Sequence, residues 1–211
     1  MIREDSRYRL LVEGSDDQHC VLHLMKRHGI NWADATALLP HVHDCKGFES
    51  VVASLGLSAK SYERLGVMVD ANTDIHHRWI QVKEGLDRVG VVLPVAPDAS
   101  GIVVPGIYAD WKVGVWLMPD NQSHGQLEDF LARLVPPGDG CWDYAREVTQ
   151  RAKELGARFP DKDACKAGIH TWLAWQETPG LPFGTAITAK YFGVDSVEAL
   201  AFVHWFKRLF F

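Results

Sequence analysis

Residues 10–17 read Leu-Leu-Val-Glu-Gly-Ser-Asp-Asp, and they indicate a strand followed by a helix. A short apolar run ends in Glu13 and Gly14, and acidic residues then open a segment whose apolar positions recur at helical spacing. Residues 65–70 (Leu-Gly-Val-Met-Val-Asp) repeat this arrangement. In an open α/β sheet the binding crevice lies outside the carboxyl ends of the strands. Two apolar strands that each end in a carboxylate therefore predict a divalent-metal site at that edge.

The overall composition is that of an ordinary soluble globular protein. The chain has 211 residues, of which 47% are hydrophobic and 23% charged. No run approaches the roughly 18 uncharged apolar residues of a membrane span, and the first residues lack an apolar signal-peptide core. We therefore expect a cytoplasmic protein without a membrane span. The net charge of −5 predicts that any nucleic-acid contact is local, weak or supported by another subunit.

The cysteines predict neither a disulfide framework nor a zinc ribbon. All four are scattered, without a Cys-x-x-Cys pair, and are expected to be reduced and packed. His41, His43 and Cys45 would share one face of a strand, but a zinc site needs a fourth ligand that the spacing does not identify. A polar strand edge is the favoured interpretation.

Strand-like and helix-like patterns alternate through the first half of the chain, which predicts an α/β fold with a mostly parallel central sheet flanked by helices. The expected strands are 8–12, 36–42, 65–69 and 113–118, with short β pieces within 101–108, and the expected helices are 16–27, 48–55, 75–89 and 126–134. Residues 136–140 (Pro-Pro-Gly-Asp-Gly) mark a boundary. We thus expect an α/β core over 1–135 and a helical C-terminal region over 141–211 packed on it, with helices at 142–156, 162–176 and 196–211.

The aromatic C-terminus is expected to contribute to packing. Trp205, Phe206 and Phe210, with Leu209 and Phe211, should lie on the sheet. An exposed version of this patch would instead mark an interface between subunits, as in a homodimer.

Several acidic residues are candidates for chemistry. Glu13 lies between a strand and a helix, where capping does not explain it, whereas Asp16 and Asp17 could simply cap the helix. Asn72 and Asp74 follow Asp70 at a spacing that can turn all three toward one point. Carboxylate and amide oxygens suit Mg²⁺, although acidic loop residues in water are the alternative. Further candidates follow the strand at 113–118: Asp120 and Glu128.

These motifs resemble a Toprim domain, the fold shared by topoisomerases, primases, small ribonucleases and OLD-type nucleases. The resemblance rests on the Glu13-Gly14 turn and Val69–Asn72, and on residues 115–121 (Val-Trp-Leu-Met-Pro-Asp-Asn) followed by 125–129 (Gly-Gln-Leu-Glu-Asp), which are similar to OLD-like proteins. Residues 166–187 resemble a bacterial Toprim-like family of unknown function. The implied fold is a Toprim-like Rossmannoid.

The resemblance also implies roles for individual residues. Glu13 would act as general acid or base at the scissile phosphodiester, and Asp70 would be the first ligand of Mg²⁺ or Mn²⁺. The second aspartate of the Toprim pair falls on Asn72, a departure for which Asp74 is the candidate substitute. In OLD-like proteins Asp17 and Glu128 would correspond to further metal-site acids, and Asp120 would support them.

The leading hypothesis is a metal-dependent phosphodiesterase that cuts DNA or RNA. The acidic net charge suggests that substrate binding depends on a partner, and the resemblance to OLD-like systems implies that this partner is an ATPase. The chain itself has no Gly-x-x-x-x-Gly-Lys-Ser/Thr loop. The alternative is a catalytically inactive Toprim-like binding or regulatory module, which Asn72 and the lack of a basic face favour. A third reading is nucleotidyl transfer or phosphatase activity on a small phosphorylated ligand.

Overall fold

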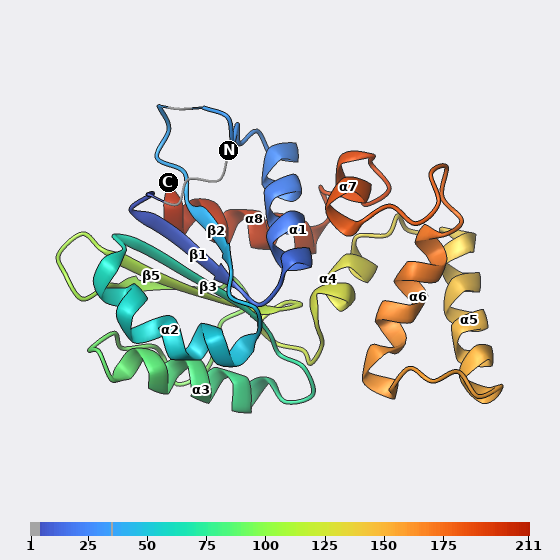
Figure 1. Cartoon of the computed structure of the whole chain (residues 1–211), viewed down its shortest axis with the longest axis horizontal. Helices are drawn as coiled ribbons and strands as arrows, with labels where there is room; N and C mark the ends of the chain where they lie inside the picture. Colours follow the sequence, from blue (N-terminus) through green and yellow to red (C-terminus); the bar gives the residue numbers. More distant parts are fainter. Residues whose placement is uncertain (1–4, 35) are drawn as a thin grey trace.

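The computed structural model describes residues 5–34 and 36–211. Their strands form one five-stranded sheet in the order β2-β1-β3-β5-β4 (Figure 1). Four strands are parallel and β4 runs antiparallel to β5 at one edge. The strands are β1 (Tyr8–Val12), β2 (His41–Asp44), β3 (Arg64–Asp70), β4 (Ile102–Pro105) and β5 (Lys112–Met118).

Helices cover both faces of this sheet (Figure 1). On one face lie α1 (Ser15–Arg27) and α8 (Val197–Phe210), and on the other α2 (Phe48–Ser61) and α3 (Ile75–Asp87). Alternate strand residues feed the two cores: Leu10 and Val12 join the first, whereas Leu11 joins the second. A strand buried on both faces reads as a continuous apolar run, which is why the sequence around residue 11 predicts this sheet.

The remaining helices follow β5. They are α4 (Leu127–Arg133), α5 (Gly140–Glu154), α6 (Ala164–Leu173), which a 3-10 turn (Asp161–Asp163) precedes, and α7 (Phe183–Thr188). Helices α5 and α6 pack against each other at one end of the molecule, and α7 packs on α1 (Figure 1). Within the described residues no helix has the length and apolar character needed to cross a membrane.

Helix α8 returns the chain to the sheet and completes one of its faces. Its docking depends on glycine in the strands below: a Cβ at Gly114 would lie 2.7 Å from Leu209 Cδ2, and one at Gly66 3.0 Å from Phe210 Cζ. Trp205, Phe206, Leu209 and Phe210 are buried as expected, whereas Phe211 is exposed. One hydrophobic core therefore joins residues from before and after the 136–140 boundary.

The α/β class, the mostly parallel sheet and the C-terminal helices are confirmed. The second strand is present, but its expected bounds of 36–42 are wrong: β2 spans His41–Asp44, because Pro40 has no N–H to donate to a ladder. The helix expected at 48–55 continues to Ser61. Helix α7 was not expected, since its six residues are too few to show a helical period.

Candidate functional site

The connections between the strands create a crevice between β1 and β3. After β1 the chain passes through α1 to β2, which lies on one side of β1 in the sheet. After β3 it continues to β4 and β5, which lie on the opposite side of β3. Ligands of open α/β sheets bind at such a topological switch point, outside the carboxyl ends of the strands. Glu13 directly follows β1, and Asp70 is the last residue of β3. The two acids predicted to pair therefore flank the crevice.

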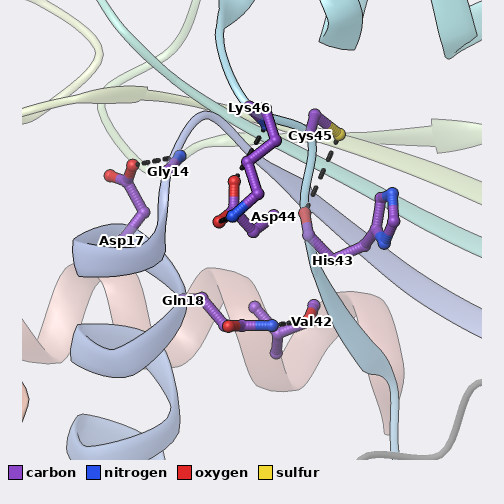
Figure 2. A network of polar contacts seen from close by, with 8 residues as sticks. All are labelled: Gly14, Asp17, Gln18, Val42, His43, Asp44, Cys45 and Lys46. Atoms are coloured by element: carbon purple, nitrogen blue, oxygen red, sulfur yellow. Dashed lines mark hydrogen bonds and ion pairs between the residues drawn. The ribbon is translucent and has the colours of Figure 1, made fainter.

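Hydrogen bonds hold these carboxylates in place. The Asp70 N–H donates to Glu13 Oε1 (2.8 Å), which joins the ends of the two strands. The Leu127 N–H, at the start of α4, donates to Asp70 Oδ1 (3.0 Å). In the first turn of α1, Asp17 Oδ2 accepts a hydrogen bond from the Gly14 N–H (2.9 Å), as the side chain of the third helical residue does in a capping box (Figure 2).

Burial and mutual repulsion raise the pKa values of these acids. Burial, with the charges of Glu13 and Glu128 added, raises the pKa of Asp17 to about 7. Burial and the charges of Asp17, Glu13 and Glu128 raise the pKa of Asp70 well above its usual range. The pKa of Glu13 is raised as well, chiefly by burial. The four carboxylates thus act on one another, and we call Glu13, Asp17, Asp70 and Glu128 the acidic cluster.

Glu128 enters the cluster from α4 with a basic partner. Its side chain is buried, and its Oε1 lies 2.7 Å from Lys166 Nζ on α6. The hydrogen bond to Glu128 raises the pKa of Lys166. Sequence reasoning did not single out Lys166, because the two residues lie on different helices and no local spacing connects them.

Asn72 connects two loops at the rim of the crevice. Its backbone is in the left-handed region (φ 52°) and exchanges hydrogen bonds of 2.7 and 2.8 Å with Gly125. Its side-chain Oδ1 accepts a hydrogen bond from Gln126 Nε2 (3.0 Å). The residue therefore fastens the loop after β3 to the loop before α4.

Asp74 and Asp120 have local structural roles. Asp74 is exposed and caps α3 by accepting from the His77 N–H (2.9 Å), a bond that lowers its pKa. Although partial burial opposes ionisation of Asp120, its hydrogen bonds from Arg133 and Ser123 lower its pKa to about 2. Of the predicted metal ligands, the acidic cluster therefore contains Asp17, Asp70 and Glu128.

The end of β2 borders α1 beside the cluster. Gln18 Nε2 donates to the Val42 carbonyl (2.6 Å), and Lys46 pairs with Asp44 in the turn that follows (Figure 2). The Cys45 thiol contacts the carbonyl of His43 (3.8 Å), as the figure also shows. These contacts fit the favoured polar strand edge.

The chemistry of the acidic cluster suits a hard divalent cation, since its donors are carboxylate oxygens whose repulsion a cation would relieve. Over residues 5–34 and 36–211, however, no three His, Cys, Asp or Glu side chains stand in an arrangement ready to hold a metal ion. Glu13, Asp17 and Asp70 each accept a backbone N–H with one oxygen. Metal binding would therefore require these side chains to adjust.

The fold and the cluster define an α/β protein with a Rossmann-like sheet and a carboxylate-lined switch point. The chain belongs to the family described as "Protein of unknown function (DUF3226)", whose model matches residues 7–211. Comparison with curated proteins and with solved structures gave no match.

Proposed function

We propose that this protein is a Toprim-like phosphodiesterase, related to the OLD-type nucleases, that cleaves DNA or RNA with Mg²⁺ or Mn²⁺. The observation that carries the proposal is the position of Glu13 and Asp70, which are hydrogen-bonded to each other across the switch point. The charges of Asp17 and Glu128 act on the same place. Buried acids with raised pKa values in a crevice are typical of functional sites.

Glu13 is the proposed general acid or base. Its hydrogen bond from the Asp70 N–H fixes the orientation of the carboxylate, so a proton can be exchanged at a defined position. Burial raises the pKa of Glu13 above its ordinary value, and such a shift makes a carboxyl group a better proton acceptor.

Asp70, Asp17 and Glu128 are the proposed residues that would hold the metal ion. When bound, such an ion lowers the pKa of a bound water and offsets the charge that develops on the phosphate. The three carboxylates must ionise to bind it, so metal binding should release protons. Lys166 limits the negative charge of the site by pairing with Glu128.

The proposal includes a partner and a location. With a net charge of −5 the chain has little to attract a nucleic acid by itself. We therefore propose a separate ATPase as the partner that brings the substrate to the site, and a cytoplasmic location. A homodimer would have to use another surface than the aromatic C-terminus, which is buried apart from Phe211, and the mass of the protein in solution tests it.

The test is incubation of the purified protein with plasmid DNA and with RNA in the presence of Mn²⁺, alongside Glu13→Gln and Asp70→Asn. Each variant should lose at least about a hundredfold in cleavage rate. Asp16→Asn is the matched control, because Asp16 is an exposed neighbour of Asp17 in the same helical turn, and it should keep the parent's rate. Cleavage that persists unchanged in both variants would remove the proposed site.

A specific observation favours the second candidate, an inactive Toprim-like binding or regulatory module. Asn72 stands where the Toprim pattern has an aspartate, and its oxygen already accepts a hydrogen bond from Gln126. Calorimetric titration with Mn²⁺ distinguishes the two functions. Binding at about millimolar affinity or better, lost in Asp70→Asn, supports the enzyme, whereas no binding supports the module.

A further inference from the structure

A cavity of about 590 Å³ lies between α5 and α6. It borders the acidic cluster through Cys165, whose Sγ lies 3.4 Å from the Glu128 carbonyl oxygen, but no member of the cluster lines it. Its walls include Trp142, Arg146, Thr149 and Lys153 from α5, Phe159 from the loop that follows, and Gly168 from α6. Ligand pockets of proteins commonly measure about 300–1,000 Å³ and combine apolar walls with a few polar groups. The size and the lining of the cavity match that description.

Thr149 has a buried side-chain hydroxyl without a hydrogen-bond partner among the residues described. Its side chain lines the cavity and is only 7% exposed, and its Oγ1 has no hydrogen-bond partner among the residues described. A helical threonine can bond to the carbonyl one turn earlier, yet this one does not. Buried hydroxyls normally have a partner, so the orphaned Oγ1 points to a molecule in the cavity.

Gly168 keeps the space beside this hydroxyl open. A Cβ at Gly168 would lie 3.8 Å from Thr149 Oγ1 and 3.5 Å from the Trp142 ring, at ordinary contact distance. A larger side chain would therefore occupy the volume that the two residues face. The absence of a side chain at Gly168 therefore keeps bulk away from both the hydroxyl and the ring.

The two aromatic rings of the cavity each have a cation beside them. The Arg146 guanidinium carbon lies 5.7 Å from the centre of the Trp142 ring, and Lys153 Nζ lies 5.0 Å from that of Phe159. Arg146 is also paired with Asp143 (2.6 Å), and Lys153 with Asp161 (3.0 Å). Lys153 Nζ donates to the Phe159 carbonyl as well. Both acids are well exposed, and such surface pairs are weak. An anionic ligand can therefore compete for the two cations.

We propose that this cavity is a binding site for an aromatic anion. A flat ring would stack on Trp142, its anionic group would lie at Arg146 and Lys153, and the Thr149 hydroxyl would hydrogen-bond to it. Mononucleotides and aromatic carboxylates share this chemistry. The site is independent of the proposed phosphodiesterase activity, because none of these residues belongs to the acidic cluster.

The test is isothermal titration calorimetry of the full chain without divalent metal, using AMP and 2-naphthoate as probes. Adenosine and inorganic phosphate are the controls that lack the anion or the ring. At least one aromatic anion should bind with a dissociation constant below about 1 mM, and about tenfold or more tightly than either control. Binding of AMP alone assigns a nucleotide, and binding of 2-naphthoate alone assigns an aromatic acid.

Two variants connect any binding to the cavity. Thr149→Val keeps the shape of the side chain and should weaken the anion about fivefold without lowering the melting temperature. Arg146→Ala should weaken the anion and leave adenosine unchanged, whereas Arg151→Ala, outside the lining of the cavity, should change neither. The proposal is overturned if neither aromatic anion binds, or if Thr149→Val leaves the affinity unchanged. Because the assay contains no metal and no nucleic acid, its failure would not bear on the phosphodiesterase.

Discussion

Asp17→Asn should make the metal-free protein more stable at neutral and alkaline pH. Asp17 is buried, and its negative neighbours are Glu13, Glu128 and Asp16. The amide of asparagine has nearly the shape of a protonated carboxyl, and its oxygen can still accept the hydrogen bond from the Gly14 N–H. The variant therefore removes the buried charge and keeps the contact that begins α1.

The size of the effect follows from the pKa of Asp17, which burial raises from 3.8 to about 7. Between these values the folded state holds a proton that the unfolded state releases, so the stability of the parent falls as the pH rises through this range. A tenfold change in acid strength corresponds to about 1.4 kcal/mol, and ionisation of Asp17 thus costs the parent about 4 kcal/mol above pH 7.

Urea denaturation at pH 4.5, 6 and 8 measures this difference. The stability advantage of Asp17→Asn should grow as the pH rises and level off above about pH 7. Asp16→Asn is the control, and its difference from the parent should change little with pH because Asp16 is exposed. An advantage of Asp17→Asn that is absent at pH 8, or that is the same at all three pH values, would refute a buried, repelling cluster.

Three further variants test other parts of the structure. Asn72→Asp should tighten Mn²⁺ binding about tenfold, since it adds a carboxylate where the Toprim pattern has one. Calorimetry that shows unchanged or weaker binding would mean that residue 72 does not contribute to the metal site. Lys166→Met should destabilise the protein by about 1–3 kcal/mol at pH 8, because it leaves Glu128 buried without its cation. A melting temperature equal to the parent's would contradict the role of Lys166 as the partner of Glu128. Gly184→Ala should lower the free energy of unfolding by about 1–3 kcal/mol, since the new Cβ would lie 3.0 Å from the His19 carbonyl oxygen where α7 meets α1. Thermal unfolding indistinguishable from the parent's would show that the two helices can move apart.

The positions of Glu13 and Asp70 could be predicted because each follows a continuous apolar run. Such runs predict parallel strands, and parallel strands bring their carboxyl ends to one edge of the sheet. The helix starting after Gly14 was equally visible from its period. In contrast, the start of β2 was missed because the apolar residues before Pro40 look like a strand, and only the absence of an N–H at that proline limits it.

The α/β class, the two carboxylates at the switch point and the aromatic packing of α8 could be predicted from the chain alone, because periodicity and residue type are local properties. The contact between Glu128 and Lys166 beside those carboxylates could not. Nor could the local hydrogen bonds of Asp74 and Asp120, or the position of the unpartnered Thr149 hydroxyl between α5 and α6. These relations join residues from different elements. They depend on how the helices pack on the sheet and on one another, and no local sequence pattern predicts that packing.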